Sequence, residues 1–232
     1  INRFCSSGLQ AVADAANLIR LGLADLLIAA GTESMSFMPQ IMGNKMAMNP
    51  AIFTDENIGI AYGMGLTAEK VANQWQISRE EQDAFALASN QKACAAIAAG
   101  HFKAETSPYL IRERLPDLKT GQFMVRERTV EFDEGPRPDA SLEKLGKLRP
   151  VFHARGSVTA GNSSQMSDGA AAVMLVSEKV LKEHNLTPLA RFASFAVGGV
   201  APEIMGIGPI AAIRKALAQA GIRLVDLDWF EL

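Results

Sequence analysis

The sequence predicts an α/β fold, in which helices cover a sheet. Segments whose apolar residues recur three and four positions apart alternate along the chain with short, continuous apolar runs, and this alternation is typical of helices packed on buried strands. The composition agrees, since 48% of the 232 residues are hydrophobic and 21% are charged, as in ordinary globular proteins. The chain is therefore long enough to bury a core.

Composition also excludes several classes of function. The net charge of −2, from 23 basic and 25 acidic residues, argues against general nucleic-acid binding, which needs a cationic excess. No apolar run in the sequence approaches the ~20 residues that span a bilayer. The two cysteines, Cys5 and Cys94, cannot form a disulfide framework and favour a reducing, cytoplasmic setting. The three histidines lack metal-binding spacing.

A first helix is predicted over residues 7–21, because its apolar residues recur at helical spacing. Ser6 or Ser7 offers the hydroxyl that caps a helix start. Gly22 is suited to end the helix, since glycine adopts the left-handed conformation that follows a last turn.

A buried strand is predicted over residues 26–30, where the run Leu-Leu-Ile-Ala-Ala is typical of a strand covered on both faces. Residues 31–34 are predicted to form a turn. The periodicity then fades over residues 35–53. This methionine-rich stretch is predicted to be irregular yet packed, because methionine fills uneven gaps.

The clearest helix start lies at Ser78, which Glu81 follows three residues later in the pattern of a capping box. The helix it begins should run to residue 99 and end at Gly100, and a shorter helix is predicted over residues 67–75. The residues of the longer helix predicted to be buried include Phe85, Ala88, Ala95 and Ile97.

The rest of the chain continues the alternation. Residues 105–150 are more charged and richer in proline, and they are predicted to form a subdomain inserted in the α/β frame. The further elements predicted are strands over 109–112, 125–132, 170–176 and 190–197, a loop over 133–138, a small-residue turn over 159–169, and helices over 178–184 and 210–220, the last ended by Gly221.

Cys5 is the sharpest candidate for chemistry. It lies just ahead of the first predicted helix, whose start carries partial positive charge and unpaired N–H groups. Both favour the nucleophilic thiolate, and Gly8 lets the backbone approach a substrate closely. The alternative is a small buried hydrophobe, and Cys94, among alanines in the middle of the long helix, favours that interpretation for itself.

Three further segments are candidate ligand-binding loops. Residues 159–169 are small and rich in hydroxyls, which lets a backbone approach a ligand, although an ordinary tight turn is the simpler interpretation. Residues 205–209 resemble a phosphate-binding glycine loop only loosely. Arg137, between two prolines, can hold an anion on a stiff loop or stand as a solvated surface arginine.

Together these segments resemble one family, the thiolases, which cleave or make β-ketoacyl-CoA. The resemblance covers essentially the whole chain, and seven motifs in order make a strong signal where any one would be weak. The matching motifs are NRFCSSGLQA at 2–11, similar to the nucleophile motif of the family, GTESMS at 31–36, MGLTAE at 64–69, SREEQD at 78–83, LRPVF at 148–152, the loop at 159–169, and IMGIGP at 204–209.

The resemblance implies roles for the matched residues. Cys5 takes the acyl group as a thioester, which divides one hard step into two. Coenzyme A is then a substrate, and neither a cofactor nor a metal is implied. The positions similar to those that contact CoA or line its pantetheine and acyl end are Arg137, Phe152, Ala160, Ser164, Met64 and Met205.

The resemblance also implies a layered α-β-α-β-α fold with an inserted loop domain, incomplete in this chain. The implied parts are an N-terminal thiolase domain over 1–34 and 167–186, a CoA-binding loop domain over 35–166, and the start of a C-terminal thiolase domain over 187–232. Neither end has the polar character of a natural terminus, so we expect a chain truncated at both ends.

Two departures from the family pattern bear on function. Gly63 stands where the branch that makes acetoacetyl-CoA usually has a histidine, and together with residues 162–168 it favours the degradative branch of fatty-acid β-oxidation. The later motifs of the family, which carry an asparagine, a histidine that activates the nucleophile and a proton-shuttling cysteine, have no match in the sequence.

Several functions stay open on this evidence. The first is thiolytic cleavage of 3-ketoacyl-CoA, the second is a biosynthetic acetyl-CoA acetyltransferase, and the third, of another class, is a non-catalytic carrier of CoA or lipid. A condensing enzyme of the ketoacyl-synthase type would need a basic docking patch, and the sequence has no clear run of Lys and Arg. The expected partners are acyl-CoA, CoA and further copies of the chain, in a homodimer or homotetramer.

Overall fold

The computed structural model describes residues 1–37 and 49–231, and the chain forms two compact units. The first comprises Ile1–Val71 and Met166–Leu232, and the second comprises Ala72–Gln165. The greater part of the stretch predicted to be irregular, residues 38–48, lies outside the described residues.

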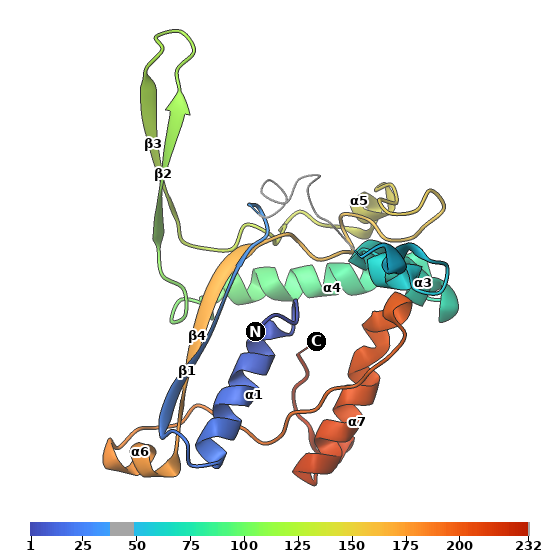
Figure 1. Cartoon of the computed structure of the whole chain (residues 1–232). Helices are drawn as coiled ribbons and strands as arrows, with labels where there is room; N and C mark the ends of the chain where they lie inside the picture. Colours follow the sequence, from blue (N-terminus) through green and yellow to red (C-terminus); the bar gives the residue numbers. More distant parts are fainter. Residues whose placement is uncertain (38–48, 232) are drawn as a thin grey trace. The chain divides into compact units, whose positions relative to one another are not determined.

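The first unit contains a two-stranded antiparallel sheet (Figure 1). Strand β1, Leu26–Ser34, pairs with β4, Asp168–Val176, along the whole length of both strands. The helices and 3₁₀ turns of this unit are α1 (Ser7–Arg20), η1 (Pro50–Phe53), η2 (Ile58–Ala61), α3 (Met64–Gln74, whose last residues belong to the second unit), α6 (Glu178–Glu183), η3 (Pro202–Ile207), α7 (Gly208–Ala220) and η4 (Leu224–Asp226).

Helix α1 packs along the sheet through small side chains. Ala13 and Ala16 of α1 and Ala29 of β1 are buried, and alanines at a contact let a helix approach its neighbour closely. Gly22, with a φ of 72°, follows the last turn as predicted. The capping prediction was wrong, because the Ser6 hydroxyl makes no capping hydrogen bond.

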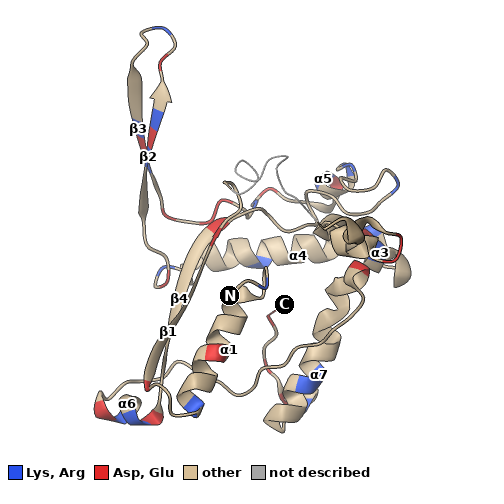
Figure 2. Cartoon of the chain, in the orientation of Figure 1, with Lys and Arg blue, Asp and Glu red and all other residues tan. Residues whose placement is uncertain are grey.

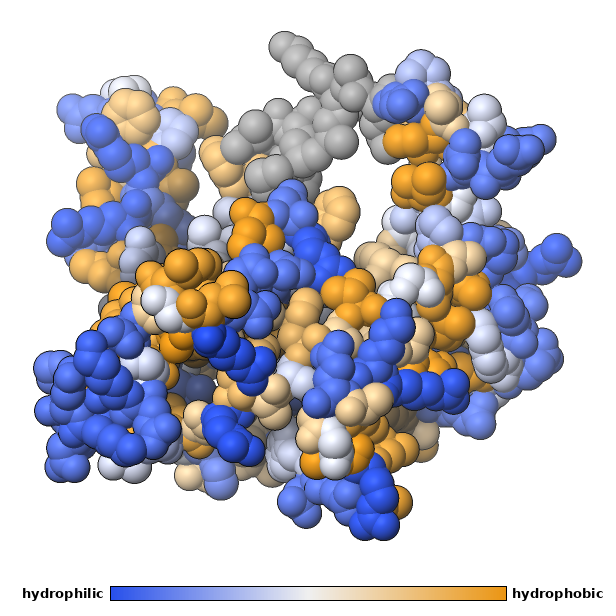
Figure 3. Space-filling view, turned by 60° about the horizontal axis from the view of Figure 1, so that its bottom comes forward, coloured by the Kyte–Doolittle hydropathy of each residue, from blue (hydrophilic) through white to orange (hydrophobic). Residues whose placement is uncertain are grey.

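Strand β1 differs from its prediction in two ways. It continues to Ser34, because residues predicted to turn go on pairing with β4. It is also covered on one face rather than on both: Ala29 is buried, whereas Ile28, whose side chain points to the opposite face, is 67% exposed. Figure 3 shows exposed hydrophobic residues beside hydrophilic ones on the face that it displays.

The strand predicted over residues 190–197 is not formed. The Arg20 side chain instead donates to the carbonyl oxygens of Phe192 and Ala193, at 3.0 and 2.8 Å, and its guanidinium lies 5.0 Å from the centre of the Phe192 ring. A strand needs a neighbouring strand for its backbone groups. Here the Arg20 side chain of α1, rather than a strand, is the hydrogen-bond donor to two of these backbone carbonyl groups.

The second unit combines a long helix with a β-hairpin. Strand β2, Tyr109–Pro116, pairs antiparallel with β3, Phe123–Val130, so both predicted strands exist with shifted bounds. Charged residues of both signs lie along this hairpin (Figure 2), and one pair, Arg112 and Glu127, forms an ion pair of 2.8 Å across the two strands. The helices of the unit are α4, Arg79–Ala98, and the short α5, Leu142–Gly146.

Helix α4 has the predicted ends but not the predicted buried face. The Ser78–Glu81 capping box is present in full, and Gly100 follows the helix with a φ of 74°. Phe85, however, is 79% exposed, and Asp83 is the buried residue of the helix. The apolar residues of α4 do not form one stripe, so the inward face is set by the polar contacts of Asp83 rather than by hydrophobic pattern.

Candidate active site

Cys5 lies in a constrained turn that leads into α1. Phe4, directly before it, has a φ of 50°, a backbone conformation that bulky residues rarely adopt and that often marks a functional turn. Cys5 itself is exposed, which does not fit the alternative of a buried structural cysteine. The first turn of α1 carries no acidic residue, so no carboxylate neutralises the partial positive charge there.

The Ser7 hydroxyl closes this turn. It accepts a hydrogen bond from the Arg3 amide at 2.8 Å and donates one to the Phe4 carbonyl at 2.7 Å. The Arg3 guanidinium in turn donates to the Gln10 side chain at 2.8 Å. Three residues of the nucleophile-like motif therefore hold the backbone on both sides of Cys5.

Cys94 has different surroundings. It lies within α4 and is half-buried, and the Asn90 side-chain amide approaches its sulfur at 3.8 Å. This fits the packing role predicted from its alanine-rich neighbours.

The two predicted methionines lie on linked elements of the first unit. Met64 is the first residue of α3 and Met205 lies in η3, and both side chains are about half exposed. An ion pair of 3.9 Å between Lys70 and Glu203 joins the two elements.

Three of the predicted CoA-side residues line one cavity of the second unit. Arg137, Ala160 and Ser164 contribute to an open cavity of about 1160 Å³, whose wall on one side is α4. A cavity of this size can accept a large ligand. Phe152 is 43% exposed and is not among the lining residues.

The loop that carries Arg137 is fastened to α4 by one side chain. The Arg137 N–H donates to Asn90 Oδ1 at 2.8 Å, and Asn90 Nδ2 donates to the Arg137 carbonyl at 2.6 Å. Both backbone groups of Arg137 are thus held by one amide. Arg137 is exposed, and its charge also interacts with the nearby Asp139 carboxylate.

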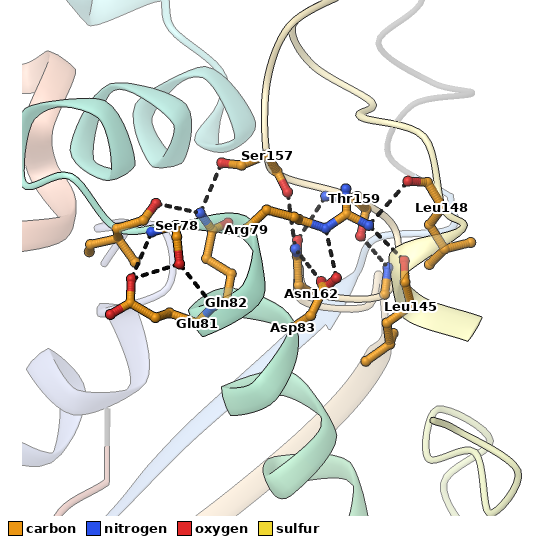
Figure 4. A network of polar contacts seen from close by, with 12 residues as sticks. Ser78, Arg79, Glu81, Gln82, Asp83, Leu145, Leu148, Ser157, Thr159 and Asn162 are labelled. Carbon is orange, nitrogen blue, oxygen red and sulfur yellow. Dashed lines mark hydrogen bonds and ion pairs between the residues drawn. The ribbon is translucent and has the colours of Figure 1, made fainter. Parts of the chain in front are cut away.

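The loop that carries Ala160 and Ser164 is held by a buried polar network (Figure 4). Asp83, 4% exposed, accepts a hydrogen bond from Asn162 Nδ2 at 2.9 Å. The same amide bonds the Ser157 carbonyl at 3.1 Å, and its oxygen accepts from the Thr159 N–H at 2.7 Å. Asn162 therefore folds the loop around its own side chain.

Arg79 completes this network. Its Nε donates to Asp83 Oδ2 at 2.7 Å, so the buried carboxylate is paired with a cation, as buried charges require. Its Nη2 donates to the carbonyl oxygens of Leu145 and Leu148, at 2.6 and 3.1 Å. One arginine thus joins the start of α4 to the end of α5.

Gly161 shows why this loop needs small residues. A Cβ atom at this position would lie 2.5 Å from Leu145 Cδ2 and 2.6 Å from Leu148 Cδ1, closer than carbon atoms can approach. Any larger residue at this position would therefore force the side chains of Leu145 and Leu148 to move. The sequence had suggested small residues for access to a ligand or for a tight turn.

A second carboxylate joins two of the matched motifs in the first unit. The Ser36 hydroxyl and backbone N–H both donate to the Asp168 side chain. These bonds, the hydroxyl bond foremost, hold the pKa of Asp168 below its ordinary value. They tie the turn after β1 to the start of β4.

No group of three or more His, Cys, Asp and Glu side chains within residues 1–37 and 49–231 is arranged to hold a metal ion, and no helix in those ranges is both long and apolar enough to cross a bilayer.

Comparison with family models decides the family. Residues 1–179 match the model described as the N-terminal domain of thiolase, and residues 186–232 match that of the thiolase C-terminal domain. This chain belongs to the thiolase family. The recognition made from the seven motifs is thereby confirmed.

Curated thiolases align with the whole chain. It is 48% identical over its full length to the 3-ketoacyl-CoA thiolase of Bacillus subtilis, of which it covers 59%. It is 45% identical, again over its full length, to the acetyl-CoA acetyltransferase of Shinella zoogloeoides, of which it also covers 59%. The chain thus spans about three fifths of the length of these relatives.

Solved thiolase structures share the fold. The dimeric peroxisomal thiolase of Saccharomyces cerevisiae aligns with a TM-score of 0.84 and 40% identity over 98% of this chain and 56% of its own. Human mitochondrial 3-ketoacyl-CoA thiolase in complex with CoA aligns with a TM-score of 0.79 and 40% identity, covering 98% of this chain and 57% of its own. These alignments confirm the predicted thiolase-like α/β fold.

Some contacts of this thiolase chain were not predicted from the sequence. Asp83 falls in the matched SREEQD motif, and an aspartate four residues after an arginine on a helix is a known pairing signal, but its burial has no sequence signal. Asn162 falls in the matched loop over 159–169, but its role as a backbone clamp has no sequence signal. Asn90 has no signal either, because an asparagine that clamps a distant backbone looks like any polar residue.

Proposed function

We propose that this thiolase cleaves 3-ketoacyl-CoA by forming an acyl thioester on Cys5. The observation that carries the proposal is the exposed Cys5 in its constrained turn at the start of α1, within a stretch similar to the family's nucleophile motif. The 48% identity to a protein named 3-ketoacyl-CoA thiolase supports it.

The chemistry takes place in two steps. The Cys5 thiolate attacks the 3-oxo carbon, the bond between C2 and C3 breaks, and its electron pair stays on C2 of the departing acetyl-CoA, which takes up a proton. The acyl group remains on Cys5 as a thioester. The thiolate of a second CoA then attacks the thioester carbonyl and restores the Cys5 thiolate. The resemblance assigns the proton transfers to the histidine and second cysteine of motifs that have no match in this sequence.

The proposed CoA contacts divide by chemistry. Arg137 suits the anionic nucleotide end of CoA, the Ser164 hydroxyl suits an amide of the pantetheine arm, and Ala160 leaves room for that arm. The apolar side chains proposed for the arm and the acyl end are Phe152, Met64 and Met205. CoA is a substrate in this account, and no separate cofactor takes part.

The main rival is the biosynthetic direction, the making of acetoacetyl-CoA. Relatives at 43 to 45% identity are named acetyl-CoA acetyltransferase, whereas Gly63 and residues 162–168 favour the degradative branch. Thiolysis rates of the full-length protein with 3-ketoacyl-CoA substrates of different chain length distinguish the two. We expect turnover of chains longer than acetoacetyl-CoA, and activity confined to acetoacetyl-CoA would favour the rival.

The remaining proposals concern assembly and location. For assembly we propose a homodimer or a homotetramer, and the dimeric yeast thiolase supports the homodimer. A cytoplasmic location rests on the two cysteines, while two relatives from Arabidopsis thaliana carry the name peroxisomal.

Replacement of Cys5 tests the proposal. In the full-length protein, Cys5→Ala should lower thiolysis by about three orders of magnitude or more, as loss of a covalent nucleophile does elsewhere, while CoA still binds. Cys94→Ala is the matched control and should keep nearly full turnover. Substantial turnover by Cys5→Ala would overturn the assignment, and CoA binding without any acyl transfer by the unchanged protein would favour a non-catalytic carrier.

A further inference from the structure

The two loops that carry Arg137 and Ser164 are held by side chains of the same helix. We infer that Asp83 and Asn90 of α4 are positioning residues, which fix these loops for CoA. The inference rests on the proposed role of the loops in binding CoA. Neither Asp83 nor Asn90 is itself assigned a contact with the ligand.

Asp83 and Asn90 project from one face of α4. They lie seven residues apart, which is close to two full helical turns. The cavity that Arg137 and Ser164 line is also lined by Asn90 itself and by Gln82 and Ser89, each of which directly precedes one of the two residues. Helix α4 is 20 residues long and capped at its start. It therefore gives both loops a rigid element to which they are hydrogen-bonded.

Asp83 acts on its loop through Asn162. The bond from Asn162 Nδ2 to Asp83 Oδ1, of 2.9 Å, fixes the amide that organises residues 157–162. Ser163 adds a bond from its hydroxyl to the Thr159 carbonyl at 2.6 Å, and Thr159 is fully buried. Ser164 follows directly on this clamped stretch, so the place of its backbone depends on a carboxylate that it does not touch. Its hydroxyl donates to the Gln165 carbonyl at 3.3 Å.

Asn90 acts on the other loop directly. Its two hydrogen bonds to the backbone of Arg137, of 2.8 and 2.6 Å, leave the arginine Cα little freedom. Arginine side chains lose rotamer entropy when they bind an anion, and a fixed backbone lowers the entropy that remains to be lost. The clamp should therefore strengthen binding without adding a contact to CoA.

A purely structural role makes a different prediction from a positioning role. If the network only holds the unit together, its loss lowers the melting temperature and the amount of active enzyme, which lowers kcat and leaves KM unchanged. If it positions binding loops, its loss weakens the binding of CoA equally in the ground state and in the transition state. This raises KM and leaves kcat nearly unchanged.

The test uses the full-length protein with Asn90→Ala, Asp83→Asn and Asp83→Ala. The control is Gln91→Ala, an exposed residue of the same helix that does not line the cavity. Calorimetry measures the Kd of CoA directly, and thiolysis gives the KM for CoA and kcat. We expect Kd and KM to rise about tenfold in Asn90→Ala, the lower end of what lost supporting contacts cost elsewhere, with kcat and melting temperature close to those of the unchanged protein. Asp83→Asn keeps one of the two acceptor oxygens that Arg79 and Asn162 use and should show a smaller rise than Asp83→Ala, which removes both.

Two results would overturn the inference. One is an unchanged Kd for CoA in Asn90→Ala, a variant of a half-buried surface residue that needs no refolding of the core. The other is an equally large rise of the Kd for CoA in the control variant Gln91→Ala. The direct measurement of CoA binding separates this inference from the proposed reaction. If the unchanged protein shows no thiolysis but CoA binds more weakly to Asn90→Ala, the positioning role is supported and the proposed activity is contradicted.

Discussion

Cys5 and Cys94 carry the same thiol in two different settings. Cys5 is exposed where α1 begins, and Cys94 is half-buried within α4. The difference follows from the chain itself, because the turn around Cys5 is closed by its sequence neighbours Arg3 and Ser7, whereas α4 continues without a break around Cys94. Accessibility, rather than the presence of a thiol, distinguishes the nucleophile candidate.

Alkylation measures that difference. We expect iodoacetamide to modify Cys5 at least about tenfold faster than Cys94, because an exposed thiol at a helix start is the more reactive kind. Peptide mass spectrometry over a time course of limited labelling reports both rates in one sample. Faster labelling of Cys94 would contradict the structure around both residues.

Asp168 gives a prediction about pH. Its hydrogen bonds with Ser36 lower its pKa from the ordinary value of 3.8, and a carboxyl whose pKa is lower in the folded state stabilises the fold at pH values above its ordinary pKa. That contribution is lost as the pH falls below 3.8. Asp168→Asn should therefore melt at a lower temperature than the unchanged protein at pH 7, and the gap should close at acidic pH.

Ser36→Ala is the matched test of this pair. It should lower the melting temperature at pH 7 by a similar amount, and the double variant should lose less than the sum of the two single losses, because both remove one interaction. A difference in melting temperature between Asp168→Asn and the unchanged protein that stays the same from pH 7 down to pH 3 would contradict this account of Asp168.

At the scale of elements, the two ends of α4 were predictable and its packing partners were not. The capping box at Ser78 and the glycine after α4 act within a few residues of chain, so the sequence contains the whole cause. The strand expected over 190–197 needed a neighbouring strand, and the exposure of Phe85 depends on which loops cover α4. Such features depend on residues far away in the sequence, and local pattern cannot reveal them.

The contact between α5 and the loop of Ala160 gives the prediction at this scale. Gly161→Ala should destabilise the fold by about 1–3 kcal/mol, the usual cost of overpacking, because its new methyl group would overlap Leu145 and Leu148. Urea denaturation of the full-length protein measures the loss.

Gly146→Ala is the control for this substitution. Nothing lies within 4 Å of a Cβ atom at that position in α5, and alanine favours helix over glycine, so the variant should be as stable as the unchanged protein or slightly more stable. Equal stability of the two variants would show that the close approach at Gly161 does not exist in solution.

At the scale of the whole molecule, motif order was more informative than any single element. Seven short motifs predicted the thiolase family, and both family models and structures at TM-scores of 0.79 to 0.84 confirm it. Of the predicted CoA-side residues, the structure brings Arg137, Ala160 and Ser164 to one cavity. The domain boundaries and the roles of the site residues stay predictions.

One measurement tests the central proposal most directly. The full-length protein is mixed with acetyl-CoA without an acceptor thiol, quenched in acid and digested, and each cysteine peptide is weighed by mass spectrometry. A thioester on Cys5 predicts that the peptide of residues 4–20 gains one acetyl group, which is lost when free CoA is added before the quench. An acetyl group on the peptide of Cys94, or none on either cysteine, would contradict the account.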